Sequence, residues 1–522
     1  MEMAPKPIPV GTRASVSDAK LAYFEGDFER CLEICADIRV GSVATTSEVA
    51  LLSARAYLRT GRPREAQAAI VDTLETHATL DASLTAQMLV ASARIRQDDP
   101  DTGIAILHEA ASRCSGAHFA VSSEIAFATA LGYWAKRDID TAETYLAQVD
   151  PRADIIHARA LELQAWCDTA RANYRRSAEG FKRTLVRLDE CTAHDRAIAA
   201  TAICTLSIYS AELFDADLAR FVDLKAEQLN WSSGLSAQHF LTLVYQALYR
   251  EFAGDTLGAY QYAALARESA PTIAFEVLAW SMSAIVARNA GEPFTATLHA
   301  KRALDLLESI DGQELVGEER FALLAVAEAC THFDPQRSAQ LCTRYFGLAP
   351  VDRLVSYSND VRLTADEAFI TGVVAEAAGD SKRARHCYRE AFEMFAGIGY
   401  VRRAVGAGYA LLQLERDEAV LHYVKTHLGA TKNYISAALA RDGEAQPDVL
   451  ERHPIVASLP DGQREVVTLI CQGKTNKEIA QLRNVGEQTI KNMLSKHIFR
   501  AFGVSNRAAL VSTCLSDRAS GF

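Results

Sequence analysis

Apolar positions recur at spacings of three and four residues from about residue 15 to about residue 440. This is the period of an amphipathic helix, and no stretch alternates apolar and polar residues as a half-buried strand would. The longest uncharged apolar run, Ile198 to Ala211, is shorter than the ~20 residues that a membrane-spanning helix needs. The pattern therefore predicts an all-α protein without a membrane segment.

A repeating signal divides this helical region into units. A turn residue recurs at intervals of 35 to 45 residues, and a small residue follows it five positions later. The turn residues are Gly26, Gly61, Asp98, Arg137, Asn173, Phe214, Gly254, Gly291, Asp334 and Gly379, and the small residues are Cys31, Ala66, Gly103, Ala142, Ala178, Ala219, Ala259, Ala296, Ala339 and Ala384. Prolines that suit the first turn of a helix follow four of these turns, at Pro63, Pro100, Pro293 and Pro335. We expect helix pairs that stack, since one pair alone cannot bury its apolar face.

Several units resemble the tetratricopeptide repeat (TPR), a helix-pair motif: Ala50 to Ile70, Val373 to Phe392, Leu21 to Ile34 and Leu131 to Leu146. The units around Phe214 and Asp334 match less well and predict helix pairs only. The resemblance implies a curved superhelix whose extended concave surface binds a protein, a peptide or a small effector. The alternative is an array that serves only as a dimerisation platform.

The stretch from Leu459 to Val511 carries three short helical patterns separated by tight turns, with a fourth behind them. Thr475 and Glu478 form a capping box at the start of the second pattern. Gly486, followed by the acidic Glu487, predicts the start of the third. The expected apolar sides comprise Ile479, Ala480 and Leu482 in the second pattern, and Ile490, Met493, Leu494, Ile498, Ala501 and Phe502 in the third. The second and third patterns predict a helix-turn-helix.

This stretch resembles the LuxR/FixJ-type helix-turn-helix domain of bacterial transcription regulators. The matching segments are Gly473 to Ala480, Glu487 to Lys491, Ile498 to Val504 and Asn506 to Val511. The resemblance implies a four-helix DNA-binding module whose third helix enters the major groove. It also implies that the fourth helix, Asn506 to Leu515, contributes to dimerisation.

The stretch departs from the family pattern at several positions. The family opens with Leu-Thr-x-Arg-Glu, whereas Pro460, Asp461, Gly462 and Gln463 follow Leu459 here. Gly486 replaces the usual serine, and Arg483 occupies the apolar position that closes the second helix. The segment between Lys491 and Gly503 is one residue longer, which a longer helix or a π-bulge could absorb. These departures concern helix packing and sequence specificity more than the fold.

Charge is distributed unevenly along the chain. Nine Lys and Arg against five Asp and Glu give residues 454–522 a net charge of +4; since the whole chain carries −11, residues 1–453 carry −15. A basic end on an acidic body suits a nucleic-acid-binding module attached to a regulatory domain, although +4 alone is an ordinary balance. Eleven cysteines without a CxxC pair indicate reduced thiols in a cytoplasm.

Motifs for catalysis, metal binding or cofactor binding are not found. Gly473-Lys474-Thr475 ends like a phosphate-binding loop, but the residue five positions before Gly473 is Thr468 rather than glycine. The thirteen histidines are dispersed. We therefore predict a protein that is not an enzyme and that needs no cofactor or metal.

Taken together, these patterns predict a disordered leader (residues 1–14), a TPR-like helical-repeat domain (15–441), a linker (442–454) and a LuxR-type helix-turn-helix domain (455–522). We expect a cytoplasmic bacterial transcription regulator whose body receives a signal and whose C-terminal module binds promoter DNA. The side chains predicted to read base edges are Gln488, Lys491, Asn492 and Ser495. Those predicted to contact phosphates are Lys474, Thr475, Asn476, Lys477, Thr489, Lys496 and Arg507.

The expected partners are double-stranded promoter DNA, a second copy of the chain, and an unidentified protein, peptide or small effector on the repeat domain. RNA polymerase is a further candidate partner. The alternative function is a TPR-like interaction scaffold in which the helix-turn-helix is degenerate and no longer reads DNA.

Overall fold

The computed structural model describes residues 15–38, 43–75, 79–115, 117–191, 195–310, 315, 320–331, 333–346, 360–428, 435, 439, 454–471, 474–483, 485–504, 507 and 510. The predicted leader lies outside these residues, as does the predicted linker except for Pro454. The chain divides into two compact units, Met1–Tyr434 and Ile435–Phe522. Regular structure in the described part is entirely helical, which confirms the all-α prediction. No helix among these residues combines the length and apolar character that crossing a membrane requires.

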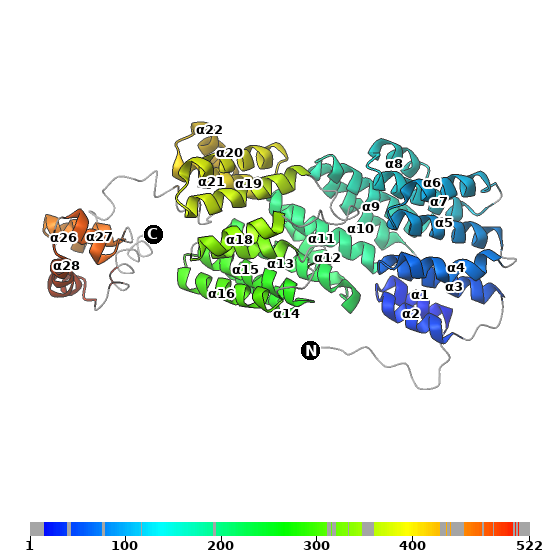
Figure 1. Cartoon of the computed structure of the whole chain (residues 1–522), viewed down its shortest axis with the longest axis horizontal. Coiled ribbons are helices and arrows are strands. Elements are labelled where there is room, and N and C mark those ends of the chain that lie inside the picture. Colours follow the sequence, from blue (N-terminus) through cyan, green and yellow to red (C-terminus); the bar gives the residue numbers. More distant parts are fainter. Residues whose placement is uncertain are drawn as a thin grey trace. The chain divides into compact units, whose positions relative to one another are not determined.

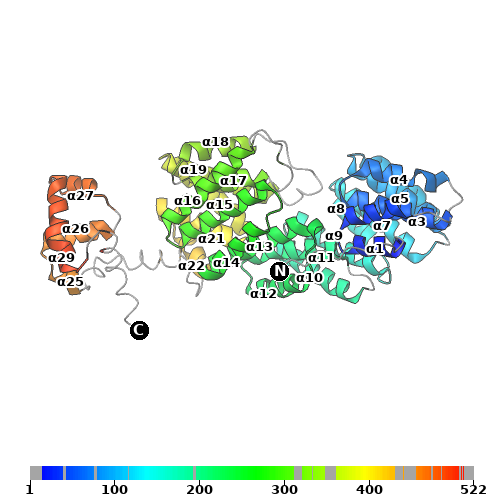
Figure 2. The same cartoon turned by 90° about the horizontal axis from the view of Figure 1, so that it is seen from below.

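The first unit, here called the body, consists of helix pairs that follow one another along the chain (Figures 1 and 2). Its helices are α1 (Val16–Phe24), α2 (Phe28–Asp37), α3 (Val43–Arg59), α4 (Pro63–Glu75), α5 (Leu80–Arg96), α6 (Pro100–Ser112), α7 (Phe119–Ala135), α8 (Ile139–Leu146), α9 (Asp154–Ala170), α10 (Tyr174–Glu190), α11 (Arg196–Glu212), α12 (Ala216–Gln228), the short 3₁₀ helix η1 (Ser233–Leu235), α13 (Ser236–Ala253), α14 (Thr256–Glu268), α15 (Ile273–Asn289), α16 (Pro293–Ser309), α17 (Phe321–Cys330), α18 (Pro335–Phe346), α19 (Asp360–Ala377), α20 (Ser381–Gly397), α21 (Val401–Leu414) and α22 (Glu418–Leu428). The four TPR-like stretches coincide with α1–α2, α3–α4, α7–α8 and α19–α20.

The predicted turn residues owe their recurrence to backbone geometry. Gly26, Gly61, Asp98, Arg137, Phe214, Gly254, Gly291 and Gly379 all have a positive φ, between 53° and 85°. This left-handed conformation lets the next backbone N–H groups bond back to the helix that has just ended. After Gly26, for example, Asp27 N–H donates to Ala22 O at 3.0 Å, and the Asp27 side chain then caps α2 by accepting from Arg30 N–H at 3.2 Å. Each such turn therefore ends one helix and starts the next.

Two predicted turn residues were wrong. Asn173 has a φ of −88°, and the left-handed residue is Ala172, one position earlier, with a φ of 60°. Asp334 lies outside the left-handed region and instead caps α18, accepting from Arg337 N–H at 2.9 Å. In both units the polar residue stands at the N-cap and not at the turn itself, and of the two only the Asp334 side chain accepts a capping hydrogen bond.

The small residues lie where the two helices of a pair cross. Cys31, Ala66, Ala142, Ala259 and Ala384 are completely buried. Gly103 has no room for a side chain, because a Cβ there would lie 2.8 Å from Ala91 O of the paired helix.

The expected small residues of two units are corrected by the structure. Ala296 and Ala339 are only partly buried, whereas Ala300 and Ala303 of α16 and Ser338 of α18 are completely buried. The Ser338 hydroxyl donates to Ala327 O at 2.6 Å, so this crossing is fixed by a hydrogen bond between α18 and α17.

Segments about two hundred positions apart meet within the body. Ser232 Oγ donates to Glu25 O at 3.2 Å, 207 positions away in sequence. Gly234 faces Gly26 so closely that a Cβ at 234 would lie 2.3 Å from Gly26 O. These contacts show that the stacked pairs wind back on themselves, which confirms the predicted superhelix.

A buried ion pair connects two further helices of the superhelix, α21 and α11. Arg402 Nη2 of α21 lies 2.5 Å from Glu212 Oε1 of α11, 190 positions away, and the two side chains are only 11% and 6% exposed. Beside it, the rings of Tyr174 and Tyr400 pack with their centroids 4.5 Å apart. Burying two charges is favourable only when they are paired, so this contact constrains how α11 and α21 dock.

The second unit contains α25 (Pro454–Ser458), α26 (Asp461–Cys471), α27 (Asn476–Leu482), α28 (Glu487–Met493), the π-helical turn η3 (Leu494–Ile498) and α29 (Phe499–Ala501). Its core is formed by the buried side chains of Val456, Leu459, Val466, Val467, Ile470, Ile479, Ala480, Ile490, Leu494, Ile498, Phe502 and Leu510. Only Arg507 and Leu510 of the expected fourth helix are described, so its predicted role in dimerisation lies outside the described residues.

Candidate nucleic-acid interface

The start of α27 is held by the predicted capping box. Thr475 Oγ1 accepts from Glu478 N–H at 3.2 Å, and Glu478 Oε2 accepts from Thr475 N–H at 2.7 Å. The backbone N–H and the hydroxyl of Thr475 both donate to this carboxylate, and they lower the pKa of the Glu478 carboxyl. Gly486 is the N-cap of α28, as predicted, with Glu487 in its first turn. Four residues, 483–486, therefore separate these two short helices along the chain.

Arg483 replaces an apolar family residue and makes polar contacts in its place. Its Nη1 donates to Gly462 O at 2.8 Å, and its Nε lies 3.0 Å from Glu465 Oε2. Gly462 is the other main departure in this region, and a Cβ there would lie 3.0 Å from Arg483 Nη2. The two departures therefore compensate each other across α26 and α27. Leu482 was predicted to face the core but is 63% exposed, because Arg483 occupies the inward position.

The extra residue of the third helix is absorbed by the π-helical turn Leu494–Ile498, which confirms the second of the two alternatives drawn from the sequence. Ile490, Leu494, Ile498 and Phe502 are buried at a spacing of four residues. At 3.6 residues per turn, twelve residues would rotate Phe502 about 120° away from Ile490. With one residue absorbed by the π-turn the difference falls to about 20°, so all four side chains face the core. The same shift exposes Ala501, which was predicted to be buried.

We expect this unit to tolerate deletion of Lys496. The shortened sequence would place its buried residues at spacings of a regular α-helix, and the π-turn would no longer be needed. The measured quantity is the midpoint of thermal unfolding of the C-terminal unit, followed by NMR in the full chain, and a change of no more than about 1 kcal/mol in stability is expected.

Deletion of Glu465 from the regular helix α26 is the matched control. It would rotate half of that helix by about 100° and unfold the unit. Equal destabilisation by the two deletions would contradict the register proposed for the π-turn.

The side chains predicted to read bases share one exposed face of the third helix. Gln488, Lys491, Asn492 and Ser495 are all exposed. In the unbound protein they are partly engaged within the helix: Gln488 Nε2 donates to Asn492 Oδ1 at 3.2 Å, and Lys491 Nζ lies 2.8 Å from Glu487 Oε1. The Lys491 side chain lowers the pKa of the Glu487 carboxyl. DNA base edges would therefore have to compete with these two contacts within the helix for the side chains of Gln488, Asn492 and Lys491.

The side chains predicted to contact phosphates fall into two groups. Lys474, Thr475 and Lys477 lie exposed around the start of α27, and Thr489 and Lys496 are exposed on the third helix. Asn476 and Arg507 are partly buried and bond each other, with Arg507 Nη1 donating to Asn476 Oδ1 at 3.1 Å. Arg507 also donates to Lys474 O. In the unbound protein Arg507 therefore holds the start of α27.

One further cation lies on the outer face of the third helix. Arg500 is exposed, and with one residue absorbed by the π-turn it lies about 180° from Ile490, on the side of Gln488 and Asn492. Without the π-turn it would lie about 80° from Ile490, nearer the core. In the sequence, the four-residue spacing of the apolar positions was the signal for the π-turn. That spacing alone did not identify Arg500 as a residue on the outer face.

This geometry defines a helix-turn-helix domain with an exposed polar recognition helix. Residues 457–514 match the family of bacterial regulatory proteins of the luxR type. The C-terminal unit is thus a LuxR-family helix-turn-helix domain.

Comparison of the whole chain gives weaker similarities. No match is found among curated proteins. The crystal structure of the APC/C hetero-tetramer Cut9-Hcn1 is 12% identical, with a TM-score of 0.22, covering 79% of this chain and 94% of that one. The structure of Naa15/Naa10 bound to HypK-THB is 13% identical, with a TM-score of 0.22, covering 96% of this chain and 92% of that one. The description of the body therefore rests on its own helix pairs and turns.

Proposed function

We propose that this protein is a DNA-binding transcription regulator that acts as a homodimer in the bacterial cytoplasm. The observation that carries the proposal is the exposed face of the third helix in a LuxR-family domain. A helix fits the major groove, and amide and ammonium groups can pair with base edges there. The helical-repeat body would receive the signal, from a protein, a peptide or a small effector.

In this proposal Gln488, Lys491, Asn492 and Ser495 read bases. Asparagine can pair bidentately with adenine, and lysine can donate to guanine. The Ser495 hydroxyl donates to Lys491 O at 2.9 Å, which leaves its lone pairs to accept from a base. Lys474, Thr475, Asn476, Lys477, Thr489, Lys496 and Arg507 fix the register on the phosphates, and Arg500 joins this set because of the π-turn.

The alternative function, an interaction scaffold with a degenerate helix-turn-helix, was based on departures from the family pattern. These departures are Gly462, Gln463, Arg483 and the extra residue. Arg483 bonds to Gly462 O, and the π-turn restores the buried stripe, so both changes are accommodated within a packed core. This favours DNA binding over a degenerate domain. A gel shift of the full-length protein on the region upstream of its own gene tests the choice, and binding no tighter than to unrelated DNA of equal length would refute it.

Replacing Glu487 by glutamine should strengthen binding to all DNA sequences. The change frees Lys491 from its ion pair at 2.8 Å and removes a negative charge from the DNA-facing helix. One additional neutralised phosphate corresponds to a gain of up to about tenfold at 0.1 M salt. The gain is measured by fluorescence anisotropy against salt concentration.

Asp461→Asn is the matched control, since it also removes one negative charge from this unit. Asp461 is 98% exposed and lies at the start of α26, where it pairs with Arg464 at 3.5 Å. An equal gain in the two variants would mean that only the overall charge matters.

A further inference from the structure

The body closes on itself in two places, and the two closures differ in chemistry. In the first, the turn between α1 and α2 meets the segment that leads into α13. In the second, α21 meets α11. One continuous core fills the second closure, because Tyr400 and Ala404 belong to the same buried cluster as Ile203 and Tyr209. Apolar burial therefore holds this closure together, in addition to its buried ion pair.

Polar contacts hold the first closure, here called the joint, between residues 25–28 and 232–235. The Ser232 hydroxyl donates to Glu25 O at 3.2 Å. The Glu25 carboxylate pairs with Arg196 at 3.5 Å, and these two side chains are 40% and 26% exposed. An ion pair that water reaches in this way contributes little stability.

Two contacts beside the joint add to it. Arg59 of α3 pairs at 3.3 Å with Asp195, the N-cap of α11. The partly buried Phe28 packs against the cluster that contains Leu235. None of the buried clusters in the described part of the chain combines residues of α1–α4 with residues of α11–α13. The joint therefore buries little apolar surface.

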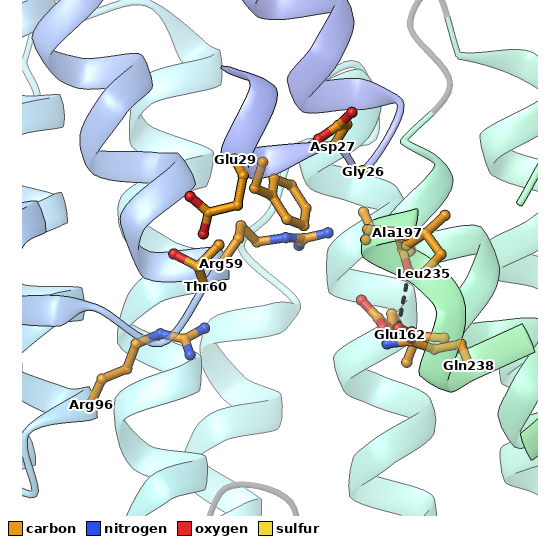
Figure 3. A pocket seen from close by; sticks show the side chains of 14 residues that line it. Gly26, Asp27, Glu29, Arg59, Thr60, Arg96, Glu162, Ala197, Leu235 and Gln238 are labelled. Carbon is orange, nitrogen blue, oxygen red and sulfur yellow. Dashed lines mark hydrogen bonds between the residues drawn. The ribbon is translucent and has the colours of Figure 1, made fainter. Parts of the chain in front are cut away.

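The joint is also hollow. A pocket of about 580 Å³ lies next to it, bordered by Gly26 on one side and Leu235 on the other (Figure 3). Protein interiors contain few voids larger than a water molecule, and atoms that face a void lose their dispersion contacts. Separating the two sides of the joint therefore gives up little packing.

The two backbones meet at the joint without side chains between them. A Cβ at position 234 would lie 2.3 Å from Gly26 O, and a Cβ at position 26 would lie 3.0 Å from Leu235 Cδ2. Since a backbone oxygen cannot swing aside as a flexible side chain can, the joint closes fully only while position 234 is glycine.

We propose that this joint is a gate. The first helix pairs separate from residues 232–235 and return, while each pair stays packed on its neighbour along the chain. Regions with few buried apolar contacts open at a free energy well below that of global unfolding. A small change in rotation at each of several stacked pairs is sufficient for this movement. Opening gives access to the pocket, and the apolar core keeps the second closure shut.

The gate gives the body two states, which goes beyond the signal-receiving role proposed above. A protein, peptide or small effector that binds one state more tightly than the other shifts their populations. The gate belongs to the body alone and is measured without DNA. Its failure would leave the DNA-binding function standing, and a failure of DNA binding in the gel shift would leave the gate standing.

Distances across the joint test the gate in the full-length protein. Spin labels are introduced as noncanonical amino acids, so that the eleven native cysteines stay unchanged, and pulsed electron paramagnetic resonance records the distance distribution. One label pair replaces the exposed Glu33 of α2 and Glu227 of α12 and spans the joint. The other replaces the exposed Asp217 of α12 and Gln413 of α21, the helix of the second closure. We expect one main distance for each pair in the wild type.

Gly234→Ala should raise the ratio of open to closed molecules at least about fivefold, because it forces a methyl group into a closed contact. The change should appear as longer distances between positions 33 and 227, with the distance between 217 and 413 unchanged. Ser232→Ala removes the hydrogen bond to Glu25 O without adding atoms and should raise the ratio about two- to tenfold. It provides the comparison if Gly234→Ala does not fold.

Gly406→Ala is the matched control, since an added Cβ there meets no atom within 4 Å. It should leave both distance distributions as they are in the wild type. Three results would overturn the proposal. These are unchanged distances between positions 33 and 227 in both joint variants, an equal change in Gly406→Ala, or an equal lengthening in both label pairs, which would indicate general loosening of the body.

Discussion

Replacing both Lys491 and Asn492 by alanine should abolish selective binding to the promoter while the protein stays folded. Both side chains are exposed on the third helix, and neither belongs to the buried core of this unit. Each well-made pair with a base edge contributes about 1–3 kcal/mol of discrimination. Loss of two such pairs should therefore reduce the ratio of specific to non-specific affinity by at least about 30-fold.

Gel shifts and footprinting on promoter and unrelated DNA measure this ratio, and circular dichroism reports folding. Lys474→Ala is the contrasting variant, because Lys474 is exposed beside the start of α27 and is proposed to contact a phosphate. It should weaken binding to all sequences and reduce the slope of log affinity against log salt by about one. Unchanged footprints in the double variant would show that Lys491 and Asn492 do not read bases.

The second large effect concerns the buried ion pair between Arg402 and Glu212. Arg402→Ala removes the partner at 2.5 Å and leaves Glu212, which is 6% exposed, only the longer contact with Arg403 at 3.9 Å. Loss of one partner of a buried ion pair costs up to about 3–5 kcal/mol of stability. Urea denaturation followed by tryptophan fluorescence measures this loss for the body alone, since all four tryptophans lie at positions 134–280.

Two variants give this measurement its controls. Arg416 and Glu418 form an ion pair with side chains 89% and 67% exposed, so Arg416→Ala should cost no more than about 1 kcal/mol. The double variant Glu212→Leu with Arg402→Met removes both buried charges and should recover most of the lost stability. A cost for Arg402→Ala as small as that for Arg416→Ala would show that the pair does not determine how α11 and α21 dock.

Much of the body could be predicted because its signals are local. A residue with a positive φ must tolerate the left-handed region, and the residue five positions later, where the two helices cross, must be small. The two therefore recur together, as at Gly379 and Ala384. The errors have the same origin. A polar residue suits both a turn and an N-cap, and sequence alone did not separate these roles at Asn173 and Asp334.

In the C-terminal unit the sequence was sufficient for features that depend on neighbours three or four residues apart. The capping box of Thr475 and Glu478 and the start of the third helix at Gly486 are of this kind. The inward turn of Arg483 was not predictable in the same way, because it depends on a carbonyl of α26 that is 21 positions away in sequence.

The sequence by itself thus determined the helical class, the repeat, the family of the C-terminal domain and the polar face of its third helix. Only the tertiary structure decided that the extra residue forms a π-turn, that Arg500 consequently faces outward, and that Gly26 meets Gly234. The physical reason is distance along the chain. Periodicity and capping act within a few residues, whereas the contact between Gly26 and Gly234 depends on the accumulated curvature of many stacked pairs.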